Sequence, residues 1–184
     1  MKKIGVVVGS FREGSFSKSL ATNIMELFPK DYELKEIQIS DLPIYTEDYD
    51  NGKLQTPEAY NRFRSEAKEF AGYVFVTPEH NRTFSAVLKN ALDVGSRPYG
   101  SSVWGGKPAL VVSQSPGNLS GFGANHHLRQ VLTFLDVYPL QQPEVYVPHS
   151  MNLFNEKGKI TNEETLGFLQ NAVDAFVLFS KKFN

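Results

Sequence analysis

Short apolar runs alternate with longer stretches of helical periodicity along the chain. The run from Ile4 to Val8 is unbroken and rich in β-branched residues, which is typical of a strand covered on both faces. Leu20, Ile24 and Phe28 then recur every four residues and predict an amphipathic helix over residues 15–28, closed by Pro29. Residues 32–39 alternate more and predict a second strand, nearer the sheet edge. This succession is the pattern of β-α units around a parallel sheet.

The same alternation continues to the C-terminus. Residues 40–56 lack periodicity and predict a long surface loop, a feature that in compact proteins is usually functional or disordered. Thr161 to Glu164 has the form of a capping box ahead of the last helix. The other predicted strands cover residues 73–76, 109–113 and 143–148. Four further helices are predicted from their apolar stripes, which are Tyr60, Phe63, Ala67, Phe70; Phe84, Val87, Leu88, Ala91, Leu92; Leu128, Val131, Leu132, Leu135; and Leu166, Leu169, Val173, Phe176, Val177.

Five strands and five helices in one series predict an α/β fold. We expect a flavodoxin-like three-layer sandwich, in which a five-stranded parallel sheet has the order 2-1-3-4-5. No linker, repeat or low-complexity tract divides the chain, so residues 1–184 are expected to form one domain.

Composition and charge narrow the classes of function. The absence of cysteine excludes disulfides, iron–sulfur clusters, thiolate metal sites and thiol nucleophiles. A net charge of −1 argues against a nucleic-acid or membrane-surface binder, since either needs a surplus of positive charge. The N-terminal apolar run stops at Gly9, too early for a signal peptide, and no run is long enough to span a membrane. We therefore expect a cytoplasmic protein.

The loop after the first strand has the composition of a phosphate cradle. Ser10, Ser15 and Ser17 offer hydroxyl donors, Arg12 offers positive charge, and the loop runs straight into a helix N-terminus. Ser15 stands where a Walker A loop needs lysine, and the second glycine of the dinucleotide fingerprint is missing. A single phosphate held without metal fits this loop. The alternative is that Ser10 or Ser15 merely caps the helix.

Two further loops follow the third and fourth strands, at the edge of the sheet where such folds bind ligands. Pro78, Glu79, His80 and Asn81 form a rigid turn whose backbone can read the edge of a planar ligand, although this tetrapeptide is also an ordinary strand-to-helix turn. Residues 113–123 are polar and flexible, and they either close over the ligand or simply connect two elements.

Motifs for chemistry by side chains are missing from the sequence. It has no nucleophile elbow, no tight carboxylate pair and no H-E-x-x-H spacing, and its four histidines are scattered. Thr77 ends the third strand, where a response regulator would carry a phosphate-accepting aspartate. The loops therefore indicate a site that binds, in which a borrowed cofactor carries any reaction.

Taken in order, the motifs resemble those of the NAD(P)H-dependent FMN reductase family. Residues 9–17 look like its G-S-x-R-x-x-S phosphate loop, Pro78 to Asn81 and residues 88–93 are similar to its P-E-Y-N and L-K-N-A-I-D signatures, and residues 106–108 and 128–130 also match. The likeness extends from Ile4 to Val147. Three departures are His80 for the common tyrosine, Ser17 for a frequent asparagine, and residues 82–85 without the usual Pro-Gly.

The resemblance implies FMN as the cofactor and NADPH or NADH as the electron donor. Hydride passes from the nicotinamide to the flavin and then to a small acceptor such as a flavin, quinone, azo compound or metal oxyanion. Members are typically homodimers or homotetramers. By motif position, the phosphate and ribityl chain would be held by Ser10, Arg12, Ser15, Phe16 and Ser17, and the isoalloxazine would be flanked by Pro78, Glu79, His80, Asn81 and the loop that contains Ser113, Ser115 and Gly117.

The leading hypothesis is therefore an FMN-dependent NAD(P)H oxidoreductase. One alternative is a flavodoxin-like FMN electron carrier that does not oxidise nicotinamide itself, although such carriers are usually strongly acidic and this chain is nearly neutral. An inert scaffold of the same fold is a third hypothesis. The sequence leaves the acceptor, the choice between NADH and NADPH, and the tightness of FMN binding open.

Overall fold

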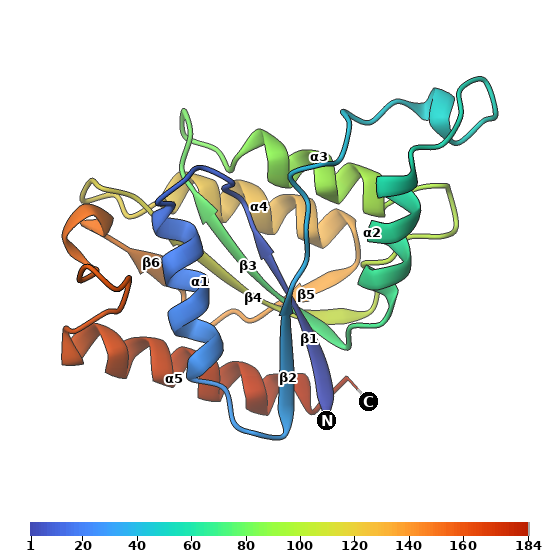
Figure 1. Ribbon diagram of the computed structural model, residues 1–184. Helices are drawn as coiled ribbons and strands as arrows, with labels where there is room; N and C mark the ends of the chain where they lie inside the picture. Colours follow the sequence, from blue (N-terminus) through green and yellow to red (C-terminus); the bar gives the residue numbers. More distant parts are fainter. Residues whose placement is uncertain (184) are drawn as a thin grey trace.

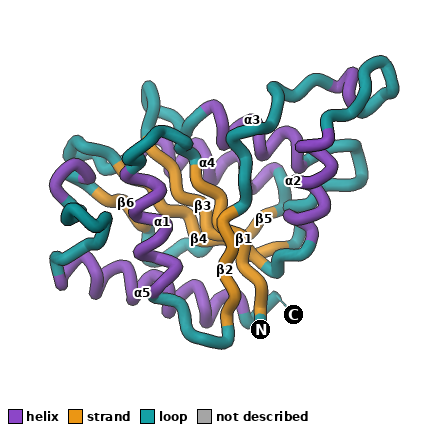
Figure 2. Tube along the Cα trace, viewed as in Figure 1, coloured by secondary structure: helices purple, strands orange, loops and turns teal. Residues whose placement is uncertain are grey.

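The computed structural model describes residues 1–183, which form one six-stranded sheet flanked by five α-helices (Figures 1 and 2). The strands are β1 (Lys2–Val8), β2 (Tyr32–Glu36), β3 (Gly72–Pro78), β4 (Lys107–Gln114), β5 (Val137–Pro139) and β6 (Val145–Val147). The α-helices are α1 (Phe16–Glu26), α2 (Glu58–Lys68), α3 (Ala86–Gly95), α4 (Phe122–Phe134) and α5 (Glu163–Ser180), and two 3-10 helices are η1 (Glu47–Tyr49) and η2 (Ser150–Asn152). All strand pairs are parallel, in the order β2-β1-β3-β4-β5. The expected flavodoxin-like order is confirmed.

The sheet is buried on both faces because alternate side chains of its central strands enter two separate cores. Val74 and Val76 of β3 face α1 and α5, whereas Tyr73 and Phe75 face α2, α3 and α4. Figure 1 shows these two helical layers on opposite sides of the sheet. Central strands buried in this way read as continuous apolar runs in the sequence. The side chains of these strands pack in the two cores, so the polar side chains that could bind a ligand lie in the loops.

The expected number of strands was wrong. Two short strands share the edge beside β4: β5 pairs with Lys107–Ala109, and β6 pairs with Val112–Gln114. The sequence predicted only the second of them, over residues 143–148. Residues 137–139 follow α4 directly, after a reversal at Asp136 with φ of 57°. Three residues are too few to show a strand periodicity, and the pairing with β4 defines them.

Several element boundaries also differ from expectation. The capping box was wrong, because Asn162 rather than Thr161 caps α5 and accepts a hydrogen bond from the Thr165 backbone N–H at 2.8 Å. Both residues are good N-caps, and only the backbone geometry distinguishes them. Four other ends shift by a few residues: α1 ends at Glu26, β2 at Glu36 and α2 at Lys68, and α3 begins at Ala86.

The expected loop over residues 40–56 forms an arm that extends beyond the body of the molecule and contains η1 (Figure 1). One anchor is Arg64 of α2, which makes two hydrogen bonds to the Asp50 carboxylate at 2.8 and 3.0 Å. Another anchor is Asn90 of α3. Its amide donates to the carbonyls of Leu42 at 3.1 Å and Pro43 at 2.9 Å, and its oxygen accepts from the Tyr45 N–H at 2.9 Å.

We expect Asn90→Ala to lower the free energy of unfolding by about 1–3 kcal/mol, because it leaves backbone groups of the arm without partners. Chemical denaturation measures this loss, and hydrogen exchange at Tyr45 reports whether the arm loosens. Asn61→Ala is the matched control, since Asn61 lies exposed on α2. Equal stability of the two variants would contradict the anchoring role.

Candidate functional site

The loops after β1, β3 and β4 meet at one edge of the sheet. The parallel register pairs Val8 with Val76 and Pro78 with Gln114, so the three strands end side by side. Their loops enclose an open cavity of about 670 Å³. The structure therefore has a cavity at the edge of the sheet where the sequence predicted a ligand site.

The first wall of the cavity is the loop between β1 and α1. Ser15 caps α1 and accepts a hydrogen bond from the Lys18 N–H at 3.3 Å, so the capping alternative holds for Ser15, which also lines the cavity. The Arg12 guanidinium donates to the carbonyls of Glu13 at 3.0 Å and Gly14 at 2.8 Å. It also lies 5.3 Å from the centre of the Phe16 ring. A fixed positive charge thus stands at this end of the cavity.

A second helix begins at the same cavity. Ser85 caps α3 and accepts from the Leu88 N–H at 3.4 Å, and both Ser85 and Ala86 line the cavity. The approach of α3 to β1 requires glycine at position 9, because a Cβ there would lie 2.7 Å from the Ser85 hydroxyl. The N-termini of α1 and α3 both favour negative charge through their free N–H groups and helix dipoles.

The second wall is a tight turn between β3 and α3. His80 and Thr83 exchange backbone hydrogen bonds of 2.8 and 3.0 Å around Asn81 and Arg82, whose φ angles are 50° and 67°. The Glu79 carboxylate accepts from the Ala124 N–H at 3.1 Å and from Arg82 at 3.2 Å. Glu79 is therefore held at the start of α4, where the helix dipole stabilises its charge.

The loop after β4 forms the third wall, where Gln114 and Pro116 face the cavity. The Gln114 amide donates to the Ser17 hydroxyl at 2.9 Å. Its side-chain oxygen is buried and has no hydrogen-bond partner among residues 1–183. A buried unpaired acceptor costs about 1–3 kcal/mol. Its position at the cavity is the expected one for an atom that pairs with a ligand donor.

The structure brings together seven of the twelve predicted site residues. The residues that line the cavity are Ser10, Arg12, Ser15, Phe16, Pro78, Glu79 and His80. Ser17 lies behind Gln114, and Asn81 lines a neighbouring hollow between α3 and α4. The other three hold their own loop: Ser113 donates to the Ser120 carbonyl at 3.2 Å, and Ser115 accepts from the Gly117 N–H at 3.2 Å.

Seven lining residues were not singled out from the sequence. Gly9, Phe11, Gln114 and Pro116 lie in the predicted phosphate and flavin loops, whereas Ser85, Ala86 and Val87 at the start of α3 were missed. Ser85 carried a usable signal, since serine just before an apolar helical stripe is a typical N-cap. Gln114 extends the predicted strand by one residue, which hid its side chain among the loop residues.

The cavity offers two kinds of surface. One end combines Arg12, small residues and two helix N-termini, which suit an anion. The remainder is lined by flat or apolar side chains such as Pro78, Val87 and Pro116. A flavodoxin-like sheet with such a cavity defines a protein that binds a planar ligand with a single phosphate.

Comparison with known proteins gives the family. Residues 2–152 match the family model described as NADPH-dependent FMN reductase. A quinone reductase of Pseudomonas putida is 49% identical over 178 residues, which cover 97% of this chain and 94% of that protein. A 2-hydroxy-1,4-benzoquinone reductase of Burkholderia sp is 41% identical, over 95% of this chain and 93% of that protein. The solved structure of FerB, a flavoenzyme NAD(P)H:(acceptor) oxidoreductase from Paracoccus denitrificans, has a TM-score of 0.92 at 33% identity and covers 100% of this chain and 99% of its own.

The chain belongs to the NADPH-dependent FMN reductase family, which confirms the resemblance seen in the sequence motifs. It is an NAD(P)H-dependent flavoenzyme, and FMN is its cofactor. These findings argue against the electron-carrier and scaffold alternatives.

The unpaired Gln114 oxygen leads to a prediction about the stability of the FMN-free protein. Gln114→Leu removes the unpaired acceptor, and Ser17→Ala in the same variant removes the buried hydroxyl that would otherwise lose its donor, so we expect the free energy of unfolding of this leucine variant to stay the same or rise, by up to about 2 kcal/mol. Denaturation of FMN-free protein measures it. Gln114→Ala is the comparison, because it also leaves a void. A clear loss of stability in the leucine variant would contradict this account of Gln114.

Proposed function

We propose that the protein reduces quinones with electrons from NAD(P)H, through FMN bound in the cavity at the ends of β1, β3 and β4. One observation carries the proposal: an anion-binding end, an apolar middle and an unpaired buried acceptor converge in this cavity. The choice of quinones draws on the relatives, two of which are named a quinone reductase and a 2-hydroxy-1,4-benzoquinone reductase.

The residues fit FMN in the following arrangement. Ser10, Arg12, Ser15 and the α1 N-terminus hold the phosphate, with Phe16 and Ser17 beside it. Arg12 already points its donors at two carbonyls of its own loop, so it can exchange these for charge-assisted bonds to phosphate. The unpaired oxygen of Gln114 accepts from a ribityl hydroxyl.

The flat end of the flavin lies between the other two walls. Pro78, Glu79 and His80 flank it on one side and the loop after β4 on the other, with Pro116 in contact and Ser113, Ser115 and Gly117 as the support of that loop. Asn81 stands at the outer end of the turn. The two backbone hydrogen bonds between His80 and Thr83 hold this turn, with Asn81 and Arg82 at positive φ angles between them.

When bound, FMN would supply the two-electron redox chemistry that links a dihydronicotinamide donor to the acceptor. The chain's own residues bind and orient the two substrates and the cofactor. Glu79 is already engaged by the Ala124 N–H and by Arg82, so its carboxylate is held in place at the start of α4. Solvent supplies the protons that a reduced quinone takes up, because the cavity is open to it.

The test is spectroscopic. Anaerobic addition of NADH or NADPH to the FMN-loaded protein is expected to bleach the flavin absorption, and 1,4-benzoquinone is expected to restore it at least tenfold faster than an azo dye or chromate. A flavin that stays oxidised with both nucleotides would overturn the proposal. Rapid bleaching with no preference for the quinone would overturn the choice of acceptor.

Arg12 is expected to act on the phosphate alone. Arg12→Ala should weaken FMN binding by about 1.5–3 kcal/mol, the scale of a charge-assisted hydrogen bond, and leave riboflavin binding nearly unchanged. Quenching of flavin fluorescence measures both affinities. Arg97→Ala, at an exposed position outside the cavity, is the control. Equal losses for riboflavin and FMN would assign Arg12 to the loop's structure instead.

Two features bear on partners. Phe122 and Phe134 of α4 are 52% and 89% exposed, which favours self-association, and we retain a homodimer or homotetramer as part of the proposal. Among residues 1–183, no helix has the length and apolarity to cross a bilayer. The cytoplasm remains the proposed location.

A further inference from the structure

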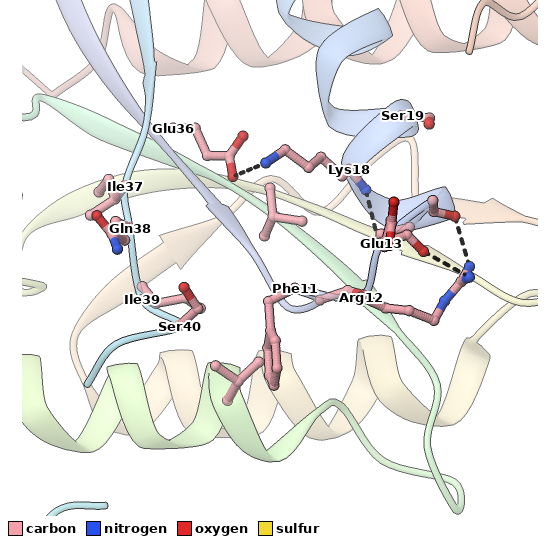
Figure 3. A pocket seen from close by; sticks show the side chains of 15 residues that line it. Phe11, Arg12, Glu13, Lys18, Ser19, Glu36, Ile37, Gln38, Ile39 and Ser40 are labelled. Carbon is pink, nitrogen blue, oxygen red and sulfur yellow. Dashed lines mark hydrogen bonds and ion pairs between the residues drawn. The ribbon is translucent and has the colours of Figure 1, made fainter. Parts of the chain in front are cut away.

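A second cavity of about 690 Å³ adjoins the flavin cavity, on the other side of the β1–α1 loop. Figure 3 shows it between this loop and residues 36–40, the end of β2 and the segment after it. The two cavities share Ser10, Phe11, Arg12, Ser15 and Val87 as lining residues. A ligand longer than FMN can therefore occupy part of one and continue into the other.

Phe11 stands on the ridge between the two cavities. Its side chain is 72% exposed and lines both of them, and in Figure 3 it extends toward α3. An exposed aromatic ring is a surface on which a planar heterocycle can stack.

Charged groups of both signs line the second cavity. The Lys18 ammonium and the Glu36 carboxylate form a 3.6 Å ion pair across it, and both side chains are substantially exposed (Figure 3). Such an exposed pair contributes little to stability, so a ligand can replace either partner at small cost. Glu13 adds a second carboxylate. When Arg12 binds the FMN phosphate, the Lys18 ammonium is left in this cavity with the carboxylates of Glu13 and Glu36.

We propose that this second cavity binds the adenosine half of the nicotinamide dinucleotide, and that Glu36 makes the enzyme prefer NADH to NADPH. The proposal rests on the proposed function, in which the nicotinamide lies over the flavin. The diphosphate then crosses the ridge at Phe11, and the adenosine ribose reaches the end of β2. A carboxylate there accepts hydrogen bonds from both hydroxyls of an unmodified ribose, as in other dinucleotide sites on parallel sheets.

The same carboxylate disfavours the 2′-phosphate of NADPH. Two negative groups a few ångströms apart in a half-exposed cavity repel each other, and Lys18 alone does not offset both Glu13 and Glu36. Glu36→Gln keeps the shape and one acceptor but removes this charge. We expect the ratio of kcat/KM for NADPH to that for NADH to rise about tenfold in Glu36→Gln.

The experiment measures both nucleotides with FMN-loaded wild type and variants, and separately titrates AMP and adenosine 2′,5′-bisphosphate into the oxidised holoenzyme by calorimetry. AMP is expected to bind the wild type more tightly than the bisphosphate, and Glu36→Gln to reverse or abolish that difference. Glu33→Gln, the same change on the same strand but outside the cavity, is the control and should leave both readouts unchanged.

The readouts separate failure of this inference from failure of the proposed function. If wild type is reduced by nucleotide but Glu36→Gln leaves the ratio and AMP binding unaltered, the second cavity is not the adenosine site. If Lys89→Gln shifts them instead, the adenosine leaves through the hollow between α3 and α4, where Lys89 lies. If neither nucleotide reduces the flavin, the proposed function fails, and the AMP titration still supports or overturns the cavity on its own.

Discussion

The parallel pairing of β1, β3 and β4 is the constraint on which the site depends. It fixes Val8 beside Val76 and Pro78 beside Gln114, and so delivers three loops to one edge of the sheet. The side chains on both faces of these strands pack in the two hydrophobic cores. Polar groups can be placed only where the strands end, which is why ligand sites in such sheets lie at the carboxyl edge.

Much of this arrangement follows from the sequence because its periodic signals are strong. Continuous apolar runs mark the buried strands, four-residue spacings mark the helices, and together they determine the strand order and the three loops. The small residues and Arg12 of the first loop identify an anion-binding end, because they allow close backbone approach and add positive charge at a helix N-terminus. The capping role of Ser15 was left open, and the structure shows that one residue both caps α1 and lines the cavity.

What the sequence does not predict depends on contacts between distant segments. β5 exists because β4 offers an unpaired edge, and three residues after Asp136 carry no signal of their own. The inward direction of Gln114 follows from the exact end of β4, one residue beyond the predicted strand. Asn81 lies outside the flavin cavity because the turn at residues 80–83 reverses the chain within two residues of positive φ. Residue type indicated which loops form the site, and geometry decided which of their side chains face the cavity.

The β1–α1 loop separates two cavities, and this makes it more than a phosphate cradle. Its inner side presents Ser10 and Ser15 to one cavity, and its tip places Phe11, largely exposed, between that cavity and the next. An exposed phenyl ring and an unpaired Gln114 oxygen are both unfavourable in the isolated chain. Neither the Phe11 ring nor the Gln114 oxygen contributes to the free energy of folding. A flat ligand with hydroxyl groups could stack on the ring and donate a hydrogen bond to the oxygen. The unfavourable exposure of Phe11 and the unpaired oxygen of Gln114 are therefore consistent with the proposed arrangement, in which the flavin lies on one side of the loop and its electron donor crosses at Phe11.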